Sequence, residues 1–222
     1  MTFYAMPNHL GFCDIDGRTI VLDLRRDRYV ELDSVTRAML NRYKDAPADL
    51  NDDAPDLARL QHLGLVVRSK VRAAPAPENT HVPTRSLRDE PRRAPQAVWP
   101  IVPEVFALLR RSRHMLKRRG LEAAVSEVRL RNDASPLGNS SAELAAAAER
   151  FRAARQLIPV QPNCLLDSLT LSSFLSRRGL GVALVFGVKL DPFAAHCWLQ
   201  APDAIVNDSA DAVIPFTPVL AV

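Results

Sequence analysis

The chain of 222 residues is long enough for one or two domains, and its hydrophobic content of 47% is sufficient for packed cores. It has no apolar run of roughly 18 residues and its first residues lack the basic and apolar regions of a secretory signal, so we expect neither a membrane-spanning helix nor export. A net charge of +4 does not by itself require a nucleic-acid partner. The three cysteines are an odd number, which indicates free thiols in a reducing cytoplasm.

The first part of the chain has the pattern of a small mixed domain. Short apolar runs separated by turn residues predict strands, and Asp16-Gly17 is a hairpin signal. The predicted elements are strands at 12–15, 19–24 and 28–32, helices at 34–44 and 56–62, and a closing strand at 65–67. This order predicts a winged-helix domain over residues 1–68.

A change of composition follows this domain. Seven of the 17 prolines lie between Pro75 and Pro103, among scattered charged residues. Because Pro-rich polar sequence buries too little surface to fold alone, we interpret residues 69–97 as a semi-extended linker.

The last part, residues 98–222, begins with helical periodicity and ends with alternation of period two. We expect helices at 103–117, 121–130, 140–157 and from 164 to 177–179, followed by strands at 182–188, 193–199 and 204–206. Helices followed by an antiparallel sheet predict an α+β domain.

One helix start carries a cysteine. Asn163 is a candidate N-cap, Cys164 is the first helical residue, and Arg177, Arg178 and Gly179 mark the end. A thiol at a helix N-terminus meets unpaired N–H groups and the positive end of the helix, which lower its pKa. Cys164 is therefore the candidate nucleophile.

A cysteine nucleophile needs a base and a group that orients the base. His196 lies in a predicted strand between small residues and Trp198. If 201–203 form a three-residue hairpin loop, His196 faces Asp208 across the sheet, whereas a slip of one residue would place Asn207 or Ser209 there. The sequence favours Asp208 as the orienting carboxylate.

Other polar groups have weaker patterns. The backbone N–H of Cys164 is the natural oxyanion donor, and the side chain of Gln161 is a second, weaker candidate. Cys13 and Cys197 read as packing residues. No metal-ligand spacing accompanies the cysteines and histidines, so we expect no metal and no other cofactor.

The basic run at 110–119 is typical of a solvated helix face, although it could also dock an acidic partner. The helices of the predicted winged-helix domain contain few Arg and Lys, and residues 45–56 are acidic, which argues against nucleic acid as the partner.

These residues also carry a resemblance to a known family. The stretches Cys164-Leu-Leu-Asp-Ser-Leu, Phe186-Gly-Val, Phe193-Ala-Ala-His-Cys-Trp and Val206-Asn-Asp are similar to those of the B protein of lasso-peptide biosynthesis, a transglutaminase-like cysteine peptidase. The N-terminal part resembles, mainly in its topology, the precursor-recognition element related to pyrroloquinoline-quinone biosynthesis protein D.

The resemblance implies a papain/transglutaminase-like core with the triad Cys164, His196 and Asp208. It implies that the chain binds the leader of a ribosomally made lasso precursor and removes it. It further implies a partner, an asparagine-synthetase-like cyclase that closes the macrolactam and that would account for any ATP requirement.

Disordered leaders commonly bind by adding a strand to a sheet edge. We therefore expect the leader to bind between the strand at 28–32 and the following helix, where the apolar residues are Val30, Leu32, Val35 and Met39. Two alternatives remain open: an acyltransferase that uses the same triad, and a non-catalytic winged-helix adaptor or regulator.

Overall fold

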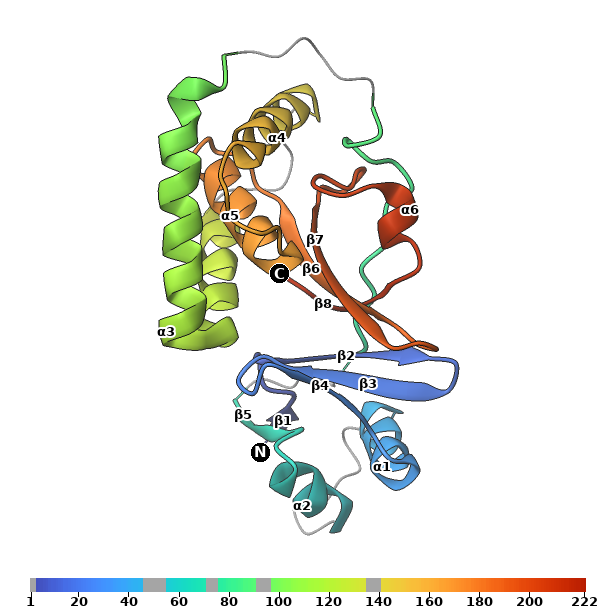
Figure 1. Ribbon diagram of the computed structural model, residues 1–222. Coiled ribbons are helices and arrows are strands. Elements are labelled where there is room, and N and C mark those ends of the chain that lie inside the picture. The colour runs from blue at the N-terminus through green and yellow to red at the C-terminus, as the bar shows by residue number, and fades with distance from the viewer. Residues whose placement is uncertain (1–2, 46–54, 71–75, 91–96, 135–140) are drawn as a thin grey trace. The chain divides into compact units, whose positions relative to one another are not determined.

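The structure is a computed structural model that describes residues 3–45, 55–70, 76–90, 97–134 and 141–222 (Figure 1). The chain divides into two compact units, residues 1–79 and 80–222. Among the described residues, no helix combines the length and apolarity that a membrane span needs.

The first unit is built on a three-stranded antiparallel sheet in the order β2-β3-β4, formed by β2 (Leu10–Ile15), β3 (Arg18–Asp23) and β4 (Arg28–Glu31). Asp16 and Gly17 connect β2 to β3 with φ of 48° and 74°, as a hairpin turn with two left-handed residues requires. β4 pairs with β3 alone among the described strands. The predicted hairpin and strand order are confirmed here.

Two helices and a second small sheet complete this unit. Asp33 caps α1 (Ser34–Asp45) by accepting from the N–H groups of Val35 and Thr36, and α2 (Pro55–His62) follows. β5 (Val67–Ser69) starts later than predicted, because Leu65 and Val66 are buried in the core of the unit instead. It pairs with β1 (Phe3–Ala5), a strand that has no counterpart among the predicted elements.

The helices of the second unit follow an irregular segment that includes residues 80–90. After a short 3-10 turn, η1 (Trp99–Ile101), the long element α3 (Val102–Ala134) breaks at Gly120, where φ is 80° and ψ is 179°. The chain reverses there, since an ion pair of 2.8 Å joins Arg111 to Glu127 across the break. α3 is therefore a helical hairpin, as the two helices predicted on either side of Gly120 require.

Helices α4 (Ser141–Gln156) and α5 (Cys164–Ser176) follow, and α5 packs against α3, α4 and the sheet (Figure 1). The sheet has the order β7-β6-β8 and is antiparallel: β6 (Ala183–Lys189), β7 (Ala194–Gln200) and β8 (Thr217–Ala221). A short helix, α6 (Ala210–Val213), precedes β8. The mixed α+β class of this part is confirmed.

The strand predicted at 204–206 is wrong. Only an isolated bridge joins Gln200 to Ile205, and the third strand is β8. β8 was not predicted because it contains Pro218, which has no backbone N–H to donate to a neighbouring strand. The structure accommodates Pro218 opposite Gly187, beside a shift in register.

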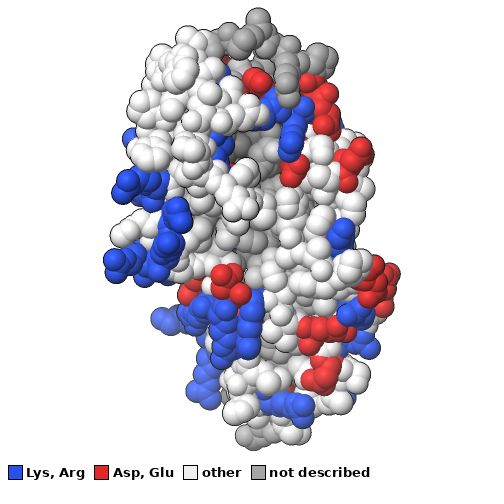
Figure 2. Space-filling view, in the orientation of Figure 1, with Lys and Arg blue, Asp and Glu red and all other residues white. Residues whose placement is uncertain are grey.

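Basic side chains gather over α3 (Figure 2). Those that are exposed include Arg110, Arg113, Lys117, Arg118 and Arg119. The predicted solvated helix face is confirmed. Together with Phe106 and Val160, part of this face borders a surface hollow of about 330 Å³.

Candidate active site

Cys164 is the first residue of α5 and is exposed. Asn163 has the extended backbone of an N-cap, and its side chain accepts from the N–H of Leu166 at 2.9 Å. The helix ends at Ser176 with Arg177 as its C-cap, and Gly179 follows with φ of 71°. The predicted bounds of this helix are confirmed, and they leave the thiol at the helix N-terminus.

The surroundings of Cys164 favour its thiolate. Hydrogen bonding to His196 is the largest influence and lowers the pKa of Cys164, and the backbone N–H groups of Cys197 and Leu165 act in the same direction. By contrast, burial raises the pKa of Cys13 to about 12 and that of Cys197 well above its usual value. Cys164 is thus the cysteine whose environment suits a nucleophile, while Cys13 and Cys197 are packing residues as predicted.

His196, on β7, contacts both Cys164 and Asp208. Its Nε2 lies 2.8 Å from Oδ2 of Asp208, which leaves the other ring nitrogen for the thiol. Hydrogen bonds to Asp208 and to Cys164 raise the pKa of His196 to about 9. Burial acts to raise the pKa of Asp208, but hydrogen bonds from His196 and from the N–H of Ser209 hold it below its usual value.

The contact between His196 and Asp208 arises differently from the sequence expectation. The N–H of Ala201 bonds to the carbonyl of Ala204, and Gln200 opposes Ile205, so the register is shifted by one residue. The pairing then stops, because the side chain of Asn207 accepts the N–H of Leu199 at 2.8 Å. The chain bends away from the ladder and Asp208 reaches the ring from this bend.

Two aromatic residues hold the imidazole. The ring of Trp198 is stacked on that of His196 with centroids 6.0 Å apart, and Phe216 packs at 5.3 Å. Trp198 is fully buried and donates from Nε1 to Gln200. Gly187 lies opposite His196 on β6 and leaves the space that the Trp198 ring occupies.

This close approach predicts a sensitive position. A Cβ at residue 187 would lie 2.6 Å from Cζ3 of Trp198 and 3.1 Å from Cβ of Phe216. We expect Gly187→Ala to lower the free energy of unfolding by about 1–3 kcal/mol, because overpacking must displace one of these rings. Urea unfolding measures this, and a change within about 0.5 kcal/mol, as is usual for surface sites, would contradict the assigned packing.

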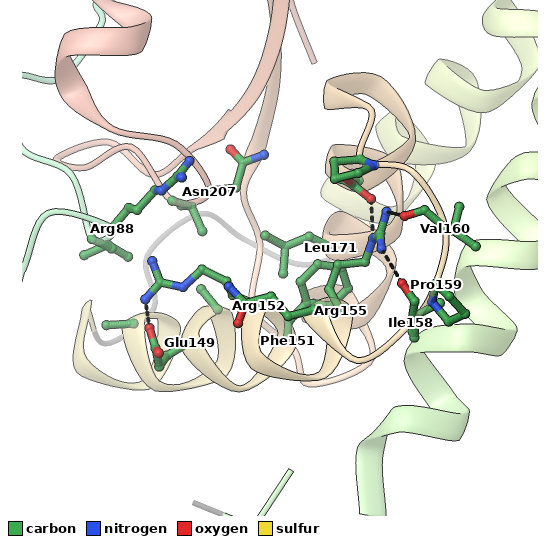
Figure 3. Close-up of a pocket in the computed structure, with 17 residues that line it drawn as sticks. Arg88, Glu149, Phe151, Arg152, Arg155, Ile158, Pro159, Val160, Leu171 and Asn207 are labelled. Carbon is green, nitrogen blue, oxygen red and sulfur yellow. Dashed lines mark hydrogen bonds and ion pairs between the residues drawn. The ribbon is translucent and has the colours of Figure 1, made fainter. Parts of the chain in front are cut away.

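The loop before Cys164 is held by a buried arginine. Arg155 bonds to Oδ1 of Asp167 at 2.7 Å and to the carbonyls of Ile158 and Val160 (Figure 3). The other carboxylate oxygen of Asp167 accepts the N–H of Asn163 at 3.1 Å. This network connects α4 to the first turn of α5 and fixes the loop that leads to the thiol.

A cavity of about 590 Å³ lies beside this network. Its lining is mostly apolar, with Phe151 and Leu171 from α4 and α5, and Arg88 and Asn207 lie on the opposite side (Figure 3). Arg88 and Asn207 come from the two segments that adjoin Asp208, so the cavity borders the carboxylate end of the site.

The remaining predicted site residues lie elsewhere. Gln161 is exposed in the loop before α5, and its backbone carbonyl accepts from Arg155. In the first unit, Val30 and Val35 are exposed, while Leu32 and Met39 are half-buried against the core. Val30 and Leu32 line a groove of about 450 Å³ that also includes Leu63 and residues near the end of α2.

Sequence reasoning missed several groups near the site. The N–H groups of Cys197 and Leu165 act on the sulfur, and Ser86 and Arg88 bond to Asp208. The last two belong to the segment that was interpreted as linker, where prolines and charges dominate. No local pattern in that segment indicated the burial of Ser86.

No group of three or more His, Cys, Asp or Glu side chains in the described part of the chain is arranged to hold a metal ion. The chemistry that the site can perform with its own residues is nucleophilic: a thiolate beside an imidazolium that a carboxylate orients.

Comparison with known proteins identifies a family for this chain. A search of curated proteins and a search of solved structures each find no match to the chain. The family model described as transglutaminase-like superfamily matches residues 105–221, just over half of the sequence. That range includes α5, the sheet and the bend at Asp208, and the chain therefore belongs to the transglutaminase-like superfamily.

Proposed function

We propose that this chain is a cysteine endopeptidase that removes the leader peptide from a ribosomally made lasso-peptide precursor before the macrolactam is closed. The observation that carries the proposal is the exposed Cys164 at a helix N-terminus, in contact with a histidine that lies 2.8 Å from a carboxylate. Members of the superfamily are usually cysteine peptidases or acyltransferases, which agrees with this chemistry.

In the proposed reaction the Cys164 thiolate attacks the scissile carbonyl carbon, and His196 gives its proton to the leaving amine. The leader remains attached as a thioester. His196, now neutral, takes a proton from water, which attacks the thioester and releases the leader as a carboxylate. Asp208 stabilises the imidazolium through both steps and does not itself transfer a proton. The N–H of Cys164 and the side chain of Gln161 are the proposed oxyanion donors.

The first unit is the proposed leader-binding element, related to pyrroloquinoline-quinone biosynthesis protein D. β4 pairs only with β3 among the described strands, so its other edge can accept an extended peptide. The groove of about 450 Å³ with Val30 and Leu32 in its lining adjoins that strand. Connection of this unit to the peptidase domain raises the local concentration of the cleavage site near Cys164.

The leader site can be tested at Val30, which is 36% exposed and so can be replaced without a large effect on folding. We expect Val30→Glu to weaken leader binding roughly tenfold or more, because a charge replaces an apolar contact. Binding of a fluorescent leader peptide measures this. Leu130→Glu, at an exposed apolar residue of the other unit, is the matched control. Val35→Glu tests whether the leader site extends onto α1. Equal affinity of the wild type and Val30→Glu for the leader would contradict the proposal that the leader binds in this groove.

A second candidate function is acyl transfer to an amine, which the same triad could perform and which the superfamily supports. Incubation of precursor with the chain, followed by mass spectrometry, separates the two. Hydrolysis gives two fragments whose summed mass exceeds that of the precursor by one water, whereas transfer gives a cross-linked product. Binding of leader with neither product would favour a non-catalytic adaptor. An asparagine-synthetase-like cyclase is the proposed partner that uses the new N-terminus.

A further inference from the structure

Residues 80–90 lie outside the range matched by the superfamily model, yet they pack against the candidate active site. The N–H of Ile205 bonds to the carbonyl of Arg85, and the N–H of Leu87 bonds to the carbonyl of Ile205, both at 2.9 Å. Ser86 and Leu87 are buried. This segment therefore lies in parallel beside the residues that lead to Asp208.

Side chains of the same segment bond to Asp208 directly. Oγ of Ser86 donates to the carbonyl oxygen of Asp208 at 2.5 Å and accepts the N–H of Arg88 at 3.0 Å. Nη1 of Arg88 lies 2.9 Å from Oδ1 of Asp208. The N–H of Ser209 also donates to Oδ1, at 2.8 Å. Oδ1 and the backbone carbonyl are thus held while Oδ2 is left for His196.

We propose that Arg88 and Ser86 are positioning residues, which fix the backbone and the rotamer of Asp208 so that Oδ2 faces His196. Asp208 follows a bend and not a regular strand, so the sheet alone does not fix its direction. The 80–90 segment supplies the missing constraints. The segment therefore contributes to the active site of the second unit and does not only connect the two units. This inference rests on the proposed triad.

The charged groups of the described residues around this contact include Asp89, which accepts the N–H of Ala210 at 3.0 Å. Asp208 faces His196 and Arg88, and His196 faces Cys164 and Asp208. Lys189 lies over the ring of Phe216, on which His196 packs. Arg85, on the same segment as Arg88, pairs instead with Glu90 and Asp203.

The test uses the full-length chain and measures the rate of Cys164 alkylation by iodoacetamide between pH 4 and 10, with mass spectrometry to identify the modified cysteine. In Arg88→Gln we expect the rate at pH 7 to fall roughly threefold to tenfold, a modest loss because the arginine is half exposed. The onset of fast alkylation at acid pH should also move to higher pH, since a poorly oriented imidazolium stabilises the thiolate less and so lowers the pKa of Cys164 less. Arg88→Lys should recover part of both effects, and Ser86→Ala should move the onset to higher pH as well.

Two comparisons separate positioning from a general loss of structure. Arg85→Ala, the matched control, should alkylate as wild type does. In an Asp208→Asn background, Arg88→Gln should have no further effect, because it acts only through that carboxylate. An unchanged onset of alkylation in Arg88→Gln, or an equal loss in Arg85→Ala or in the Asp208→Asn background, would overturn the proposal. Alkylation needs no peptide, so a failure to cleave lasso precursors would not alter this result.

Discussion

Replacement of Cys164 by alanine should abolish cleavage of the precursor while leader binding stays at the wild-type level. The expected loss is at least roughly a thousandfold, because removal of a covalent nucleophile leaves only binding and the polar surroundings to act. Leader binding should be unchanged, since the groove with Val30 and Leu32 lies in the other compact unit. Mass spectrometry of the precursor and binding of a labelled leader give the two measurements.

The chain offers matched controls for this experiment in its two other cysteines. Cys13 and Cys197 are buried and their pKa values are raised, so they should react slowly with a thiol reagent in the folded protein. Cys13→Ala should keep its activity apart from effects on stability. Residual cleavage by Cys164→Ala at the rate of the parent would reject the nucleophile, whereas faster labelling of Cys13 or Cys197 than of Cys164 would reject the assigned surroundings.

The sequence was most informative where one local signal has one structural meaning. Asn163 before an apolar run marked the start of α5, and Gly179 marked its end. Asp16-Gly17 gave the first hairpin, and the position of Gly120 between two helical patterns gave the break in α3. Each of these depends on a capping group or on a positive φ, which is encoded within a few residues.

Prediction failed where a side chain replaced a backbone partner or where distant segments met. Nothing local indicates that Asn207 takes the N–H of Leu199 and ends the ladder. Ser86 and Arg88 lie more than a hundred residues before Asp208 in the sequence, within a stretch that its prolines mark as extended. β8 was missed because Pro218 argues against a strand, although a shift in register accommodates it. The sequence register would place Asp208 opposite His196 on a regular strand, whereas in the structure the carboxylate reaches the ring from a bend.

This difference matters for the second large effect that we expect, that of Asp208→Asn. The substitution keeps the size of the side chain but replaces the charged carboxylate, whose Oδ2 lies 2.8 Å from Nε2 of His196, by a neutral amide. We expect kcat/KM for precursor cleavage to fall roughly 10²- to 10⁴-fold, because the imidazolium loses its stabilising partner and its preferred orientation. Steady-state cleavage assays over a range of pH measure this effect.

The pH profile makes the assignment specific. In the wild type, activity requires the Cys164 thiolate and the proton on His196, so it should rise as pH passes the lowered pKa of Cys164 and fall as pH rises through about 9, the pKa of His196. The hydrogen bond to Asp208 is the largest cause of that raised value. In Asp208→Asn the alkaline limb should therefore move down toward 6.5, the ordinary pKa of histidine.

Neighbouring residues show whether Asp208 itself is the orienting group. Ser209 is half-buried, makes no capping bond with its side chain and contacts Asp208 through its backbone N–H, which alanine keeps, so Ser209→Ala should keep activity within about twofold. Asn207 already uses its side chain to bond Leu199 and Ser168, at 2.8 and 2.9 Å, so its replacement should lower stability. If Asp208→Asn left the limb near pH 9 while a change at Asn207 or Ser209 moved it, the carboxylate would not be the partner of His196. The proposed hydrolytic mechanism would then lack the group that keeps the imidazole charged.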